Sequence, residues 1–443
     1  ILVGYGFVAA VLPVWLLLAP RDYLSTFLKI GTIVGLAIGI LIMRPTLTMP
    51  ALTKFVDGTG PVWTGNLFPF LFITIACGAV SGFHALISSG TTPKMLANES
   101  QACFIGYGGM LMESFVAIMA LVAACIIDPG VYFAMNSPMA VLAPAGTTDV
   151  VASAAQVVSG WGFSITPDTL HQIASEVGEQ SIISRAGGAP TLAVGMAYIL
   201  HGSLGGLMDV SFWYHFAILF EALFILTAVD AGTRAARFML QDLLGVISPG
   251  LKKTSSLPAN LLATALCVLA WGYFLHQGVV DPLGGINTLW PLFGIANQML
   301  AGMALMLCAV VLFKMKRQRY AWVALLPTSW LLICTLTAGW QKSFSPDTKV
   351  GFLAIANKFQ AMIDSGNIPP QYTESQLAQL VFNNRLDAGL TIFFMIVVVV
   401  LALFSIKTAL AALKEDKPTA KETPYEPMPE NLDAIETQAK GAH

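Results

Sequence analysis

Charged side chains are scarce in this chain. Only 11% of its 443 residues are Asp, Glu, Lys or Arg, against roughly 25% in soluble domains, whereas 56% are hydrophobic. So few charges cannot cover a water-facing surface, and most of the surface must therefore face lipid. The formal net charge is −2 and no stripe of basic and aromatic residues occurs, so we predict no nucleic-acid partner.

The chain also lacks the residue patterns of metal centres and common catalytic sites. Its six cysteines form no C-x-x-C pair and no cluster with histidines, which argues against a disulfide framework and a zinc site. No Walker motif or nucleophile elbow is present. We therefore predict that the protein is not an enzyme and has no catalytic residues, metal or cofactor.

Long hydrophobic runs fill most of the sequence. A helix needs about 20 apolar residues to cross a bilayer, and helices are expected because backbone groups in lipid must be satisfied within their own segment. The prediction is an all-α membrane protein whose transmembrane domain covers residues 1–413. About nine segments qualify as spans: 1–20, 24–43, 66–90, 102–127, 210–230, 258–276, 288–313, 320–340 and 387–409.

Basic residues predict the orientation of these segments, because Lys and Arg accumulate on the cytoplasmic side. Clusters follow the fifth, seventh and ninth segments: Arg234, Arg237, Lys252 and Lys253; Lys314, Lys316, Arg317 and Arg319; Lys407, Lys414, Lys417 and Lys421. The C-terminus is then cytoplasmic, and regions 128–209 and 341–386 are external loops. Arg44 and Lys54 are the exceptions, since this scheme leaves them outside. The charged, proline-containing tail 414–443 is expected to be disordered.

Three features of the external regions have a predicted structure. Segment 191–208 is apolar enough to span, but a crossing would reverse the side of the next basic cluster. We expect a re-entrant hairpin there, broken into short pieces by Pro190 and nearby glycines. Thr166 followed by proline predicts a helix start, and Thr373 with Gln376 has capping-box spacing.

The third segment carries the strongest candidate for a solute site. Small residues near its middle predict a break in the helix, and freed backbone groups at such breaks bind carboxylates and cations in many transporters. The alternative is that these small residues only allow two helices to pack closely. The predicted substrate-binding residues are Gly78, Ser81, Gly82, Phe83 and His84.

Three charged residues lie within predicted spans, where a charge at depth costs a few kcal/mol. Glu113 and Glu221 are candidates for proton relay or ion coordination, or else neutral, hydrogen-bonded structural groups. Lys29 could replace a coupling cation, or it could extend to the cytoplasmic interface. We assign all three to ion coupling.

Two further polar pairs leave alternatives open. Asp230 and Arg234 are spaced as a local helical ion pair, and a gate is the second interpretation. Asn297 and Gln298 lie in the seventh segment, where they could line a pathway or hold helices together.

Three stretches resemble the carbon starvation protein A family: FPFLFITIACGAVSGFHALISSGTTPKMLANE at 68–99, FEALFILTAVDAGTRAARFMLQD at 220–242 and LWPLFGIANQMLA at 289–301. The resemblance runs along the whole chain. It implies a bacterial inner-membrane transporter for peptides and pyruvate under carbon starvation, a stress response, within the amino acid–polyamine–organocation superfamily. It also makes a small cytoplasmic accessory protein a candidate partner.

The fold that the resemblance implies is an inverted repeat of five plus five helices, with the first helix of each half broken. The third segment would then be the second broken helix, and the first would precede residue 1, so the chain is expected to be the C-terminal part of a longer protein. On this overlay Lys29 occupies the helix where some proton-coupled relatives carry a lysine in place of sodium.

Three functional hypotheses remain at the level of sequence. The first is a proton-coupled symporter for a small carboxylate-bearing solute. The second is a sodium-coupled carrier of the same fold, which the sequence does not separate from the first. The third is a membrane sensor or channel, for which no signalling domain is visible.

Overall fold

The part of the chain that the computed structural model describes is helical and contains no strand. It comprises residues 1–75, 78, 80–144, 147–254, 256–281, 285–369 and 372–421, with the side chains of residues 94 and 285–289 outside the description. The predicted tail falls almost entirely on residues 422–443, outside the described residues.

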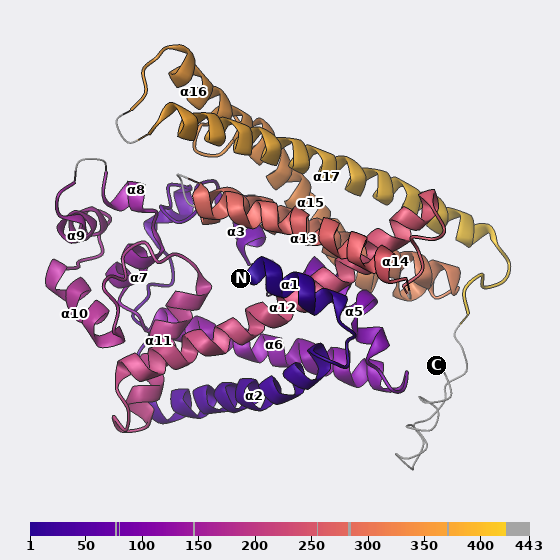
Figure 1. Ribbon diagram of the computed structural model, residues 1–443, viewed down its shortest axis with the longest axis horizontal. Coiled ribbons are helices and arrows are strands. Elements are labelled where there is room, and N and C mark those ends of the chain that lie inside the picture. The colour runs from indigo at the N-terminus through magenta and orange to yellow at the C-terminus, as the bar shows by residue number, and fades with distance from the viewer. Residues whose placement is uncertain are drawn as a thin grey trace.

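Seven helices in the described residues are long and apolar enough to cross a membrane, as predicted for an all-α membrane protein. Large apolar side chains such as Leu41, Phe104 and Leu403 are exposed on their outer surfaces, as a lipid-facing surface requires. The helices extend broadly along the long axis of the molecule (Figure 1). They are α2 (Leu18–Met43), α6 (Gln101–Cys125), α12 (Val210–Ile247), α13 (Leu257–Val280), α14 (Gly285–Lys314), α15 (Trp322–Phe344) and α17 (Glu374–Lys414).

The first predicted span is wrong as a single helix. Helix α1 (Leu2–Val11) ends before Pro13, and α2 begins at Leu18. A proline disfavours the helical conformation of the preceding residue, and Leu12 is accordingly extended, at φ −65° and ψ 150°. Because α1 is only 10 residues long, the count of nine spans and the five-plus-five repeat stay predictions.

The third predicted span is interrupted. Helix α3 (Leu67–Thr74) ends before the small-residue stretch, and α5 (Gly82–Gly90) begins after it. Ser81 precedes α5 in an extended conformation, with φ −103° and ψ 125°. Of the residues between the two helices, 76, 77 and 79 lie outside the described residues.

Shorter helices gather at one end of the bundle, away from the C-terminal end of α17 (Figure 1). They are α7 (Pro129–Asn136), α8 (Met139–Leu142), α9 (Val150–Gly160) and α10 (Pro167–Val177), with α16 (Phe352–Asp364) nearby. Single 3-10 turns cover Lys54–Asp57, Thr92–Lys94 and Gln318–Tyr320.

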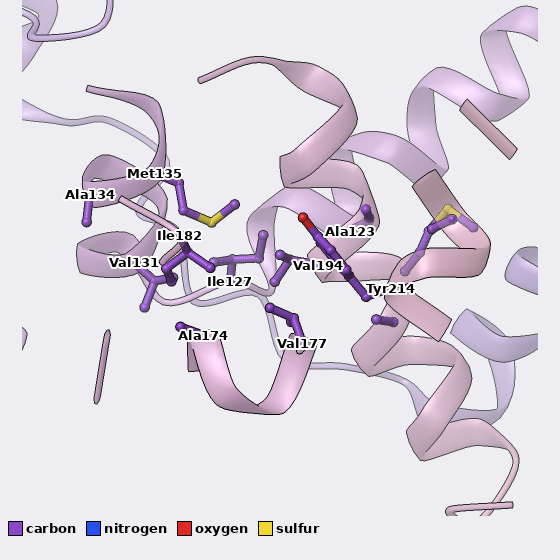
Figure 2. Close-up of a cluster of buried hydrophobic side chains, with 14 of the residues drawn as sticks. Ala123, Ile127, Val131, Ala134, Met135, Ala174, Val177, Ile182, Val194 and Tyr214 are labelled. Atoms are coloured by element: carbon purple, nitrogen blue, oxygen red, sulfur yellow. The ribbon is translucent and has the colours of Figure 1, made fainter. Parts of the chain in front are cut away.

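A buried apolar cluster fixes this end to the long helices. Figure 2 shows Val177 of α10 and Val194 of α11 (Gly188–Ser203) close to Tyr214 of α12, and Val131 of α7 beside Ile182 on the other side of the cluster. A hydrogen bond of 3.0 Å from Asn136 Nδ2 to Thr191 Oγ1 lies within this core. The described part of region 128–209 is therefore an ordered, packed layer rather than a loose loop.

Segment 191–208 differs from its expected form. Helix α11 (Gly188–Ser203) is continuous, and it is not broken into short pieces. Pro190 lies in the first turn, where its missing N–H has no helical partner to lose. Most of the helix is buried against α2, α6 and α12. Its predicted re-entrant path stays a prediction.

Both predicted helix starts are confirmed. Thr166 Oγ1 accepts a hydrogen bond of 3.2 Å from the N–H of Thr169, which opens α10. Thr373 and Gln376 form the complete capping box of α17. Local signals of this kind are readable from sequence because all their partners lie within one turn.

Candidate functional site

The start of α5 packs directly on α14. A Cβ added at Gly82 would lie only 2.5 Å from Leu300 Cβ and 2.8 Å from the backbone nitrogen of Ala301. Of the two interpretations of the small residues, close helix packing therefore applies to Gly82, because only a residue without a side chain fits against α14 there. Gly78 is different, because no atom lies within 4 Å of its corresponding position.

Two adjacent amides of α14 hold the two ends of the interrupted helix. Asn297 Oδ1 accepts hydrogen bonds from the N–H of Phe83 (2.9 Å) and from Ser81 Oγ (3.3 Å). Gln298 Nε2 donates to the carbonyl oxygen of Phe72 at the end of α3. Both amides are buried, and each has one polar atom, Asn297 Nδ2 and Gln298 Oε1, that makes no hydrogen bond to the described residues.

These bonds solve the problem that a broken helix creates in lipid. A helix N-terminus exposes backbone N–H groups and a C-terminus exposes carbonyls, and both are costly without partners. Asn297 binds one N–H at the start of α5, and Gln298 binds one carbonyl oxygen at the end of α3. The sequence signal was two consecutive amides within an apolar span, and their partners lie more than 200 residues away in the chain.

His84 and Glu113 form an ion pair that was not anticipated as a pair. His84 Nε2 lies 3.2 Å from Glu113 Oε2 and joins α5 to α6. Both side chains are partly exposed, at 55% and 41%. Glu113 therefore has a titratable partner beside the proposed break.

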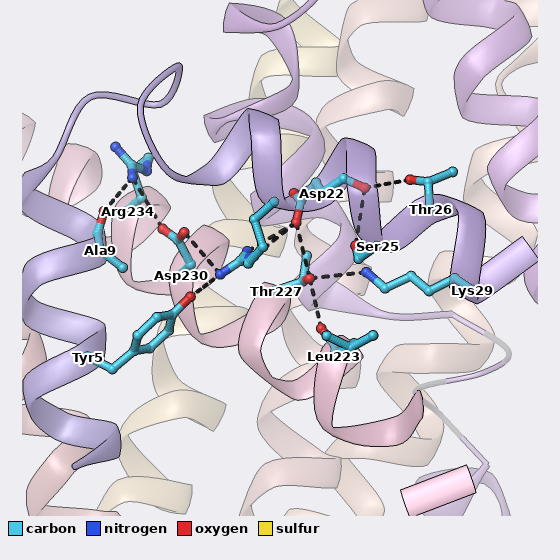
Figure 3. Close-up of polar contacts among 11 residues, drawn as sticks. Tyr5, Ala9, Asp22, Ser25, Thr26, Lys29, Leu223, Thr227, Asp230 and Arg234 are labelled. Atoms are coloured by element: carbon cyan, nitrogen blue, oxygen red, sulfur yellow. Dashed lines mark hydrogen bonds and ion pairs between the residues drawn. The ribbon is translucent and has the colours of Figure 1, made fainter. Parts of the chain in front are cut away.

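Lys29 belongs to a polar group between α2 and α12 (Figure 3). Its ammonium group donates a hydrogen bond of 3.1 Å to Thr227 Oγ1, which lies 3.2 Å from Asp22 Oδ1. The ammonium also sits 4.9 Å from the centre of the Phe224 ring. Lys29 is thus bound to a neighbouring helix, and it does not simply extend to an interface.

Asp230 lies at the centre of a second polar group on α12, fully buried (Figure 3). It is 3.2 Å from Arg234 and 3.5 Å from Arg21. The Arg234 guanidinium also donates to the carbonyls of Ala9 and Leu12, each at 2.5 Å. The local ion-pair interpretation is therefore incomplete, because Arg234 also caps the C-terminus of α1.

Phe83 connects the start of α5 to the polar group around Asp230 on α12. Its ring lies 2.9 Å from the position of a Cβ at Gly232, between Asp230 and Arg234 on α12. The structure thus brings Ser81 and Phe83 to Asn297, and His84 to Glu113. It does not give Glu221 a hydrogen bond or ion pair among the described residues, although Glu221 lies on the same helix α12.

A family model described as carbon starvation protein CstA matches residues 1–338. The chain belongs to this family. Together with the seven long apolar helices, the family identifies an integral membrane protein.

Curated members of the family include close relatives. The chain is 94% identical over 442 residues to the peptide transporter CstA of Escherichia coli K12, covering 100% of this chain and 63% of the relative. It is 60% identical over 447 residues to the E. coli pyruvate/proton symporter BtsT, covering 97% and 62%. It is 52% identical over 429 residues to the peptide transporter CstA of Helicobacter pylori 26695, covering 96% and 62%.

The chain thus spans about three fifths of the length of these relatives, by the shares of 62% to 63%. No solved structure matches.

Proposed function

We propose that the chain forms part of a secondary active transporter that imports peptides or pyruvate across the bacterial inner membrane. The observation that carries the proposal is the interrupted helix α3–α5, with both ends held by the adjacent amides of α14. Discontinuous helices supported in this way form midplane solute sites in secondary transporters. One relative is named a peptide transporter and another a pyruvate/proton symporter. The proposal is therefore transport, not catalysis.

The proposed solute site lies at the interruption. Gly78 offers open space, Ser81 and Phe83 define the start of α5, and His84 follows with a titratable side chain. Gly82 sets the distance to α14. A carboxylate would meet the positive end of α5 here.

We propose proton coupling through Lys29, Glu113 and Glu221. Lys29 is held between α2 and α12 by Thr227, and Glu113 pairs with His84. Asp230 and Arg234 act as the gate in this scheme, since Phe83 lies against the turn of α12 that carries them. The name of the pyruvate/proton symporter supports a proton over sodium.

The orientation and partners are part of the same proposal. Residues 128–209 and 341–386 face outward, and the C-terminus faces the cytoplasm, as the basic clusters predict. A small cytoplasmic accessory protein remains a candidate partner.

Uptake into proteoliposomes tests the function. We expect labelled dialanine or pyruvate to accumulate when the outside is made acidic, and to stop accumulating when the gradient is abolished. Replacing sodium with choline should leave the uptake unchanged. Uptake that needs sodium would favour the sodium-coupled carrier, and unsaturable flux would favour a channel.

A further inference from the structure

A large cavity lies at the end of the bundle that carries α8, α9 and the link from α15 to α16 (Figure 1). Its volume is about 700 Å³, within the range of pockets that hold drug-sized ligands. We call this cavity the vestibule. Its walls come from residues 57–66, from Val141 and Trp161, and from residues 341–350.

Two carboxylates face the vestibule. Asp57 Oδ1 accepts hydrogen bonds from the backbone N–H (2.9 Å) and the hydroxyl (2.6 Å) of Thr59, which lower the pKa of Asp57. Asp347 Oδ1 accepts from the N–H of Lys349 at 2.9 Å. In the described part of the chain, the second oxygen of each carboxylate makes no hydrogen bond. Both groups are therefore open to a cationic ligand.

A buried ammonium group lies behind one wall of the vestibule. Lys342 is 6% exposed and is surrounded by three rings, those of Trp63 at 5.3 Å, Phe70 at 5.2 Å and Phe352 at 5.9 Å. No hydrogen-bond acceptor binds it within the described residues. An ammonium has three donors, and ring contacts replace only part of the hydration it has lost. Lys342 therefore has unused capacity for an anion.

Phe70 separates this ammonium from the vestibule. Its side chain lines the vestibule and also covers Lys342. Phe70 belongs to α3, the half-helix that precedes the proposed solute site. Phe70 is therefore the side chain that would have to move for the Lys342 ammonium to reach the cavity that the two carboxylates line.

We propose that the vestibule is a binding site for short zwitterionic peptides, in which Asp57 and Asp347 bind the α-ammonium and Lys342 binds the α-carboxylate once Phe70 moves. This inference rests on the proposed transport function and names one of its two solute classes. Pyruvate carries no ammonium, and the two carboxylates repel it. The site therefore selects peptides before they reach the break between α3 and α5.

The test pairs each residue with one end of the ligand. Binding of labelled dialanine, N-acetyl-dialanine and dialanine amide is measured by equilibrium dialysis on the full chain in lipid nanodiscs. Asp57→Asn combined with Asp347→Asn should raise the Kd of dialanine and its amide about tenfold or more. The same double substitution should not raise the Kd of N-acetyl-dialanine, because this anion has no ammonium and loses only a repulsion. Asp57→Asn keeps an oxygen that can accept the hydrogen bonds from Thr59.

Lys342→Met should weaken dialanine and N-acetyl-dialanine by about tenfold and spare the amide. Lys358→Met is the control, since it removes the same charge from an exposed position on α16 that does not line the vestibule, and it should change the Kd less than about twofold. Lys342→Arg keeps the charge, so it should retain carboxylate selectivity even if the packing of the rings is perturbed. Melting temperatures establish that each variant is folded.

Equal weakening of all three ligands, no weakening, or an equal effect of Lys358→Met would overturn the inference, as would a wild-type chain that binds no dialanine. Transport is scored separately in proteoliposomes. Selective binding without transport would remove the proposed function and leave the vestibule site standing. Peptide uptake that does not change when Asp57, Asp347 or Lys342 is substituted would remove the vestibule site and leave the proposed function standing.

Discussion

At the scale of single residues, Asn297 is the most informative side chain of the candidate site. Its oxygen accepts two hydrogen bonds at the start of α5, whereas its Nδ2 makes no hydrogen bond to the described residues. The acceptor is therefore the functional part of the amide. A substitution that removes the oxygen should differ from one that only replaces the NH2 group.

We expect Asn297→Ala to destabilise the protein by about 1–3 kcal/mol, because it leaves the N–H of Phe83 buried without an acceptor. Peptide or pyruvate uptake should fall with it. Asn297→Asp keeps the accepting oxygen, but an ionised carboxyl at this depth costs a few kcal/mol. It should therefore retain most of the stability only at acidic pH, where the carboxyl is protonated and neutral. Melting temperatures in detergent and uptake rates measure the difference. Equal losses in both variants at acidic pH would contradict the role of the oxygen.

Two glycines of the break give a second residue-scale prediction. Gly82→Ala places a methyl group against the α14 backbone and should cost about 1–3 kcal/mol by overpacking. Gly78→Ala meets open space and should leave the melting temperature within about one degree. If both variants melt at the same temperature, the backbone of α14 accommodates a methyl group at position 82 and the prediction of overpacking is wrong.

Residue identities at this site could be predicted, but their partners could not. The small residues and the two amides are visible in an apolar run. The pairing of Phe83 with Asn297 joins residues 214 positions apart, and no periodicity encodes it. Lys342 was missed because a lysine just beyond the predicted span 320–340 looks like an interface residue. Two of its three rings, those of Trp63 and Phe70, come from a distant part of the chain.

At the scale of elements, α1 depends on α12. Arg234 and Arg237 of α12 donate to the carbonyls of Ala9, Leu12 and Ala10 at the end of α1. A helix of 10 residues is marginal on its own, so these bonds to its free carbonyls fix its position. The starts of α10 and α17 were predictable because the residues that cap these helices lie within one turn of each other in the sequence.

We expect Arg234→Met to release α1, because two carbonyls lose their donors and Asp230 keeps only Arg21. Hydrogen exchange of residues 2–11 should accelerate about tenfold or more, equivalent to about 1.4 kcal/mol. Arg44→Met is the control, since Arg44 is exposed and donates to Leu41 on its own helix. Unchanged exchange in α1 would show that apolar packing alone holds it.

At the scale of the whole molecule, the layer of short helices α7–α10 and the C-terminal end of α17 lie at opposite ends of the bundle (Figure 1). The basic clusters predict that the end of α17 is cytoplasmic. The composition and the long apolar runs were enough to predict the membrane class. The number of crossings was not, because Pro13 divides the first run and α11 is buried yet short.

Single-cysteine labelling checks the orientation. In a cysteine-free background, Asp168→Cys on α10 should react with an impermeant maleimide in spheroplasts. Lys417→Cys, beyond α17, should react only after the membrane is opened. Both positions are exposed, so a difference reports sidedness and not burial. The reversed pattern would invert the proposed topology.

The adjacency of Asn297 and Gln298 has a consequence for how the proposed carrier would move. Consecutive residues on a helix are about 100° apart around its axis, so one short piece of α14 contacts α3 on one side and α5 on the other. Any turn of α14 about its axis changes both contacts at once. The contact of Gln298 with α3 and the contact of Asn297 with α5 would therefore change together, and we expect α3 and α5 to reorient in a coupled way.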